Sequence, residues 1–166
     1  MSVRPILKWP DARLRQPAAA VTEITDEIHG HWADMVETMD ANPGGVGLAA
    51  PQIGVMLQLA VVDASLTRDR RVLLANPEIL DASETVEASE EASPCLPGVE
   101  AKVKRARAVT VRFLDQGGVI VRRDFEGLEA RSVQHQIDHL AGRMFFDRLS
   151  AVKRDMLLRR ARKAGR

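Results

Sequence analysis

The 166-residue sequence has little of several residue types that would define a class of protein. It holds one cysteine, Cys95, so no disulfide can form within the chain. Aromatic residues make up 4% of the chain, and no apolar run approaches the roughly 18 residues that a membrane-spanning helix needs. The N-terminal segment MSVRPILKWPD lacks the apolar core of a signal peptide. We therefore expect a cytoplasmic protein with no membrane partner.

The composition is that of a globular protein, with 45% hydrophobic and 28% charged residues over about one domain's length. The net charge of +1 hides an asymmetry. Seven basic residues and one acidic residue give residues 150–166 a charge of +6, which leaves −5 for residues 1–149. We expect one domain over residues 1–166 that ends in a basic helix.

Apolar spacing and turn residues predict an α+β order of elements. An extended arm is expected over residues 11–24, and four glutamates within residues 84–91 indicate a solvated face. Helices are predicted over residues 25–40, with Asp26 as N-cap, over 128–141, closed by Gly142, and over 150–164, capped by Ser150. Strands are predicted over residues 57–62, 72–75, 109–113 and 119–121, the last two joined by a turn at Gly117-Gly118.

Two of the four histidines, His135 and His139, stand four residues apart in the second predicted helix. Residues with this spacing share one helix face, so both imidazoles can reach one metal ion. Taken alone, the spacing fits two half-exposed polar residues equally well. His29 and His31 are two apart, and we expect them on the surface.

Three segments together resemble the peptide deformylase family. Residues 134–142, QHQIDHLAG, resemble its signature QHExDHLxG, and residues 45–52, GVGLAAPQ, match GxGLAAxQ. Residues 91–98, EASPCLPG, occupy the place of EGCLSxPG. The resemblance covers essentially the whole chain. It implies a small domain with mixed, mostly antiparallel sheets around a central HxxxH helix, followed by a C-terminal helix.

The resemblance also implies a reaction, the hydrolytic removal of the N-formyl group from N-formylmethionyl peptides of nascent proteins. In the family, two histidines and a cysteine hold iron(II), or zinc or nickel in its place. A glutamate moves the proton of the metal-bound water, and a glutamine and a backbone N–H hold the oxyanion. His135, His139 and Gln52 keep their family identities, and Asp138 is expected to support the histidines.

This chain departs from the signatures at three positions. Gln136 replaces the catalytic glutamate, and an amide has no proton affinity near pH 7. In the gap-free register Ser93 replaces the cysteine, and a neutral hydroxyl is a poor ligand for iron or zinc. Pro94 follows, so the backbone donor of the oxyanion site is missing. We expect the metal to be weakly bound or absent and the activity to be impaired or lost, as in a pseudoenzyme.

A second register stays open, in which Cys95 is the ligand and the Leu96 N–H is the oxyanion donor. It moves the side chain by two residues, about 6.6 Å along a strand, so the segment must bulge. Gln136 keeps its defect in either register. This register leaves room for an active deformylase that uses Cys95, His135 and His139.

The remaining expectations concern ligands. Gly45, Val46, Gly47 and Val133 are expected to line the substrate cleft, with Leu48 and Ile137 as further candidates. Arg105 is expected to pair with Glu91. The basic C-terminal helix is open to two interpretations, a solvated end favoured by the helix dipole or a contact with ribosomal RNA, and no DNA partner is expected. Without catalysis, the chain would be a module that binds formyl-peptides or the ribosome.

Overall fold

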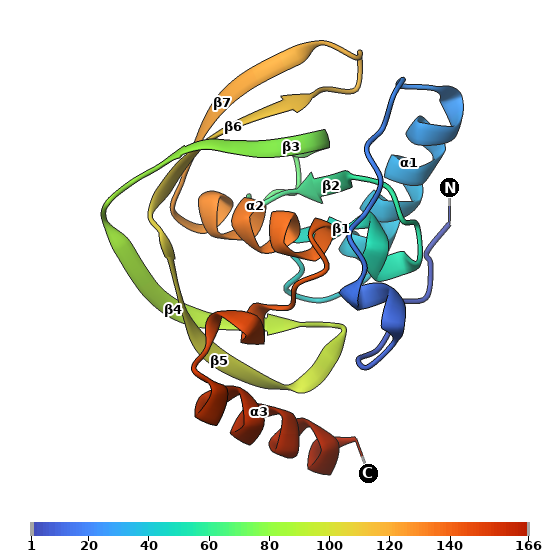
Figure 1. Ribbon diagram of the computed structural model, residues 1–166. Helices are drawn as coiled ribbons and strands as arrows, with labels where there is room; N and C mark the ends of the chain where they lie inside the picture. The colour runs from blue at the N-terminus through green and yellow to red at the C-terminus, as the bar shows by residue number, and fades with distance from the viewer. Residues whose placement is uncertain (1, 166) are drawn as a thin grey trace.

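The computed structural model describes residues 2–165 and has the α+β architecture expected from the sequence (Figure 1). The helices and 3-10 turns of this part of the chain are η1 (Ala12–Arg15), α1 (Asp26–Asp40), η2 (Ala50–Ile53), α2 (Gly127–Leu140), η3 (Phe145–Arg148) and α3 (Ala151–Ala164). Its strands are β1 (Gly47–Ala49), β2 (Leu59–Val62), β3 (Val72–Ala82), β4 (Val86–Ser93), β5 (Leu96–Ala106), β6 (Ala108–Leu114) and β7 (Ile120–Glu126). None of the helices in residues 2–165 is long and apolar enough to cross a membrane.

The strands form two antiparallel sheets, with α2 between them. The larger sheet has the order β1-β2-β3-β6-β7, and β4 pairs with β5 in a separate ribbon. Figure 1 shows α2 enclosed between the larger sheet and this ribbon, with α3 on the ribbon's outer side. A single parallel bridge, between Ala19 and Leu57, joins the N-terminal arm to the sheet in the described part of the chain. The central helix and the mostly antiparallel sheets are thus confirmed.

Strand β2 shows why both faces of the larger sheet are covered. All four of its residues are buried, and successive side chains of a strand point to opposite faces. Leu59 and Val61 belong to an apolar cluster with α1, whereas Ala60 and Val62 belong to one with α2. The strand therefore anchors one helix on each face, and α2 is the one that faces the ribbon.

A third apolar cluster joins the ribbon to the C-terminal helix. Leu157 of α3 is fully buried there with Phe145 and Phe146 of η3, and with Cys95 and Leu96 of the ribbon. Most other α3 side chains are exposed or partly exposed. One buried leucine and its neighbours thus hold α3 in place and leave its basic residues at the surface.

The predicted helices agree closely with the structure, and two details differ. The N-cap of α1 is Thr25, whose side chain accepts a hydrogen bond from the Ile28 N–H, rather than Asp26. Helix α2 begins one residue earlier than predicted, at Gly127, and ends before Gly142. Ser150 caps α3 as predicted, by accepting from the Lys153 N–H.

The ribbon of β4 and β5 was not predicted from the sequence. Its strands carry mostly polar, exposed residues, so the alternation of apolar and polar residues that marks a half-buried strand is weak. Most of residues 84–91 are exposed, as expected for a solvated face, but Glu91 is buried. The N-terminal arm is also less extended than predicted, because η1 interrupts it and buries Leu14.

Gly142, the residue that ends α2, provides a test of this packing. Its φ is +75°, and a Cβ there would lie 2.6 Å from the Arg15 carbonyl oxygen. Gly127 also has a positive φ, of +59°, but nothing lies within 4 Å of its Cβ position. We predict that Gly127→Ala lowers the free energy of unfolding by about 1–2 kcal/mol. The change Gly142→Ala should cost at least about 3 kcal/mol, because the backbone must also move. Urea unfolding measures both free energies. Equal losses of stability in the two variants would contradict the close approach of position 142 to the Arg15 carbonyl.

Candidate active site

The two histidines of α2 lie side by side, as their spacing predicts. The ring centroids of His135 and His139 are 5.0 Å apart, and both side chains are buried. His135 also stacks on Phe145 of η3, with centroids 6.2 Å apart and an interplanar angle of 15°. One face of α2 therefore presents two adjacent imidazoles whose orientation is fixed by packing.

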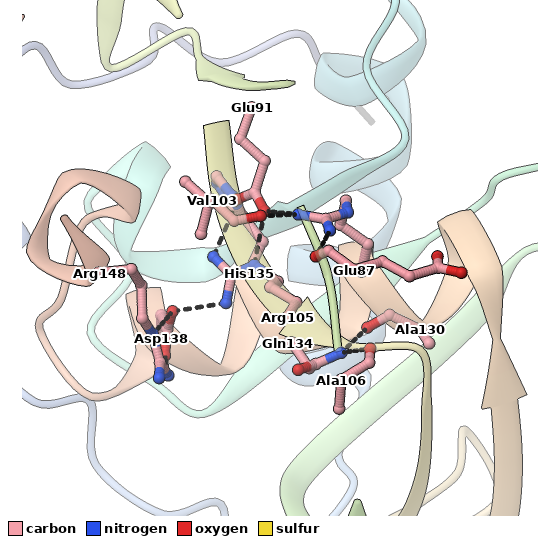
Figure 2. Close-up of polar contacts among 11 residues, drawn as sticks. Glu87, Glu91, Val103, Arg105, Ala106, Ala130, Gln134, His135, Asp138 and Arg148 are labelled. Atoms are coloured by element: carbon pink, nitrogen blue, oxygen red, sulfur yellow. Dashed lines mark hydrogen bonds and ion pairs between the residues drawn. The ribbon is translucent and has the colours of Figure 1, made fainter. Parts of the chain in front are cut away.

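Glu91 holds His135 in one orientation (Figure 2). Its Oε1 lies 2.8 Å from His135 Nδ1, and Oε2 accepts hydrogen bonds from Arg105 Nε at 2.6 Å and Arg131 Nη1 at 2.5 Å. Burial alone raises the pKa of the Glu91 carboxyl, but the hydrogen bonds from His135 and Arg105 outweigh it and lower this pKa to about 2. Because an ionised carboxylate can only accept, His135 Nδ1 carries a proton and donates to Glu91.

Asp138 extends this buried network to the end of α2. It accepts hydrogen bonds from Arg105 Nη1 at 2.9 Å and from Arg148 Nη2 at 2.6 Å. Burial lowers the pKa of Arg105, but the carboxylates of Glu91 and Asp138 more than compensate and raise it. The predicted pair of Arg105 and Glu91 is confirmed. Asp138 acts on His135 through Arg105 and Glu91 rather than by direct contact.

His139 is the less satisfied of the two histidines. It is 1% exposed, and neither ring nitrogen has a hydrogen-bond partner among residues 2–165. Burial, reinforced by the neighbouring His135 and Arg105 side chains, lowers the pKa of His139 well below the usual value, so its ring is neutral. A buried neutral imidazole without a hydrogen-bond partner is the state in which histidine binds a metal ion or a polar ligand.

Gln136 occupies the position of the family's catalytic glutamate, between the two histidines. Its side chain is 4% exposed, and no described residue is a hydrogen-bond partner of Oε1. The amide lies against Gly47 of β1, where a Cβ would come within 2.7 Å of Gln136 Nε2 and 2.5 Å of Ser132 Oγ. Only glycine fits position 47, and the amide fills the place where a carboxylate would take up a proton.

The turn between β4 and β5 places Ser93 and Cys95 in different surroundings. Ser93 pairs with Leu96 across the turn, and its Oγ accepts from the Cys95 N–H at 3.2 Å. Cys95 is fully buried in the third apolar cluster, and burial raises the pKa of its thiol. Pro94, which offers no N–H, lies at the tip of the turn, and its carbonyl accepts from Lys8 Nζ at 2.6 Å.

Gln52, the expected oxyanion donor, is tied to its neighbours. Its Oε1 accepts from the Ala49 N–H at 2.9 Å, and its Nε2 donates to Cys95 Sγ at 3.5 Å. Of the two expected oxyanion donors, the Gln52 amide is therefore already hydrogen-bonded within the protein. The backbone donor falls at Pro94, which has no N–H.

A cavity of about 560 Å³ connects most of these residues. Its walls include the following predicted site residues: Gly45, Val46, Gly47, Gln52, Ser93, Leu96, His135 and Gln136. Val133 lies elsewhere, in the apolar cluster between α2 and the larger sheet, since it stands on the sheet-facing side of the helix. Cys95 and His139 belong to the layer behind the wall.

Several residues that line the cavity were not predicted from the sequence. Met39, Leu128 and Pro97 add to its apolar wall, and Arg131 and Ser132 add polar groups. Leu48, which was a further candidate from the sequence, also lines the cavity. Ser132 and Leu128 precede His135 by one and two helical turns, so helical periodicity from His135 is the signal that identifies them.

The residues present fit a metal ion in part. His139 offers unpartnered nitrogens, and the contact of His135 with a carboxylate is typical of a metal-binding histidine. A third ligand beside the two histidines is missing, because no three His, Cys, Asp or Glu side chains within residues 2–165 are grouped so that they could hold an ion. The two imidazoles therefore suit a metal, but the rest of the donor set does not match the thiolate-containing set of the family.

The structure has a histidine pair at a cavity in a small α+β domain, and comparisons identify its family. The family model of polypeptide deformylase matches residues 3–155. A peptide deformylase of Acidobacterium capsulatum is 45% identical over 168 residues, covering 100% of this chain and 98% of that protein. The chain belongs to the peptide deformylase family, whose members are metal-dependent hydrolases of protein biosynthesis.

Solved structures agree with this assignment. The crystal structure of a peptide deformylase from Legionella pneumophila has a TM-score of 0.89 and 41% identity, covering 99% of this chain and 96% of that one. The peptide deformylase from Ehrlichia chaffeensis in complex with actinonin has a TM-score of 0.92 and 33% identity, with 100% and 99% covered. The chain therefore has the fold of the family over its whole described length.

Arg105 tests the buried network. Its side chain is 2% exposed, and it bridges Glu91 and Asp138. We predict that Arg105→Met lowers the free energy of unfolding by about 3–5 kcal/mol, because two buried carboxylates lose their partner. The matched control is Arg112→Met, which removes an exposed pair with Glu78 and should cost about 0–1 kcal/mol. Similar small losses in both variants, measured by urea unfolding, would contradict the role of Arg105.

Proposed function

We propose that this protein keeps the peptide-binding cleft of the deformylases and hydrolyses N-formylmethionyl peptides poorly or not at all. The observation that carries the proposal is Gln136, which stands between the histidines, faces the cavity and has no proton affinity near pH 7. The hydrolytic step of the family needs a group at this position that accepts and returns a proton.

The other carboxylates at the cavity do not replace it. Glu91 lines the wall, but its oxygens contact His135, Arg105 and Arg131. Glu90 lies exposed at the rim, opposite Lys102 in the ribbon. Neither offers a free carboxylate between the histidines.

The missing acid–base group and oxyanion donor set the expected reduction in the rate of hydrolysis. General acid–base help contributes about 10²–10⁴ in rate, and one oxyanion donor about 10²–10³. Their product, roughly 10⁴–10⁷, is an upper bound, because groups that act together are not additive. In the family the bound metal activates water and polarises the formyl carbonyl. In this chain Gln136 and Ser93 can orient a ligand by hydrogen bonds, but they move no proton.

An ordinary deformylase is the alternative, and the level of identity favours it. Relatives named peptide deformylase are 40–45% identical over 98% of their length. This alternative requires Cys95 to leave the apolar cluster and reach His135 and His139, and it requires another base in place of Gln136. Iron, zinc or nickel would then complete the site.

Steady-state hydrolysis of formyl-Met-Ala-Ser distinguishes these two functions. We predict a kcat/KM at least about 10³-fold below that of the Acidobacterium capsulatum relative, assayed in parallel with added nickel or iron. A value within about tenfold of that relative would overturn the proposal. The change Gln136→Glu alone should recover less than about tenfold, since Ser93 and Pro94 remain. Adding Ser93→Cys and Pro94→Leu should recover at least about 10²-fold.

The basic surface of α3 supports a ribosomal location in the cytoplasm. Lys153, Arg159, Arg160, Arg162 and Lys163 are exposed, while Leu157 anchors the helix. Such a surface attracts the phosphates of ribosomal RNA. We include ribosome contact in the proposal, with nascent N-formylmethionyl chains as the peptide partner.

Reversing the charge of α3 tests this contact. We predict that Arg159→Glu with Arg160→Glu weakens co-sedimentation with ribosomes at least about tenfold at low salt, because two phosphate contacts become repulsive. The control is Arg122→Glu, a change at an exposed arginine on β7 in the larger sheet, which should leave binding within about twofold. Equal effects of the two changes would indicate non-specific attraction and contradict a contact through α3.

A further inference from the structure

Two positions that are negatively charged in an ordinary member of the family are neutral in this chain. Ser93 replaces a thiolate, and Gln136 replaces a carboxylate. Both side chains line the cavity, and both are less than 5% exposed. The polar end of the cavity has therefore lost two negative charges where solvent screens charge poorly.

The charges that remain are already paired. The buried carboxylates near the histidines are Glu91 and Asp138, and their partners are Arg105, Arg131 and Arg148. Three guanidinium groups against two carboxylates leave no negative charge to balance a divalent cation. Two imidazoles with no anionic ligand bind such a cation much more weakly than a set that includes a thiolate.

The groups available to a ligand are uncharged. Gln136 Oε1 is a buried acceptor with no partner among the described residues. Ser93 Oγ accepts from the Cys95 N–H, which leaves its hydroxyl proton free to be donated. An amide group, with one N–H donor and one carbonyl acceptor, matches these two groups.

A free amino terminus matches them poorly. With a pKa of about 7.7–8.0, it is largely an ammonium at pH 7. Burial would remove its hydration, and the three guanidinium groups would repel it. One N–H of Gln52 Nε2 is used on Cys95 Sγ, and Pro94 offers no N–H at the position of the family's backbone donor. The cavity therefore discriminates by charge rather than by the formyl group itself.

On the basis of the proposed function, we propose that the cavity holds no resident divalent metal ion and binds the blocked, uncharged end of a peptide. The amide of the blocked end contacts Gln136 and Ser93. The neighbouring side chain lies against the apolar wall that includes Met39, Leu48 and Leu128. A binding site for N-acylated chain ends thus replaces a metallohydrolase site on the same fold.

Metal content tests the first half of the proposal. Protein produced in medium with added iron, zinc and nickel and then dialysed should retain less than about a tenth of an equivalent of metal. Its melting temperature should not change with a chelator. The double variant Ser93→Cys, Gln136→Glu restores both charges and should retain about one equivalent. One equivalent of metal in the unmodified protein would overturn the proposed metal-free site. A double variant that retains no metal would show that the two missing charges are not what prevents metal binding.

Calorimetric titration with a chelator present tests the second half. We expect formyl-Met-Ala-Ser and acetyl-Met-Ala-Ser to bind within about threefold of one another, and Met-Ala-Ser at least about tenfold more weakly. The change Gln136→Leu keeps the charge and removes the amide, so it should weaken binding of both blocked peptides at least about tenfold. Equal binding of the free and blocked peptides, or binding of none, would overturn the proposal.

Formate release separates the two proposals. Fast release by the metal-free protein would overturn the proposed loss of hydrolysis. Slow release by a protein that holds one equivalent of metal would leave that loss standing and overturn only the metal-free site.

Discussion

The contact of Glu91 with three cationic or polar side chains holds the site and the fold together. Glu91 lies on β4, Arg105 on β5, and Arg131 and His135 on α2, so one carboxylate joins both strands of the ribbon to the central helix. The ribbon and the larger sheet share no strand pairing. Buried charges are stabilising only when all their hydrogen bonds are made, which ties the position of the ribbon to that of α2.

The same network explains how the fold tolerates the changes at the cavity. Its carboxylates, Glu91 and Asp138, are neutralised by arginines rather than by anything bound in the cavity. The negative charge that a metal ion needs must come from the positions of Ser93 and Gln136. Serine and glutamine have almost the same shape as cysteine and glutamate, so the packing is kept when these residues stand at the two positions.

The sequence predicts the parts of this structure that depend on local signals. The three helices follow from apolar spacing and caps such as Ser150, and the pair of His135 and His139 follows from a spacing of four. The ribbon was missed because most of its residues are polar and exposed, so the apolar alternation along its strands is weak. Val133 was misplaced because a helix between two sheets buries both faces, and only the packing shows which one borders the cavity.

Likeness of fold and ability to catalyse therefore rest on different residues. Leu59, Val61 and Leu157 build the apolar clusters, and Arg105 with Glu91 builds the polar one; none of these groups transfers a proton. A TM-score of 0.92 to a relative reports the path of the backbone and not the chemistry of the side chains at the cavity. The departures from the family signatures are an amide in place of a carboxylate, a hydroxyl in place of a thiol and a proline without an N–H, and the backbone path carries no trace of them. What decides the chemistry is the protonation and charge of a few buried side chains at one cavity.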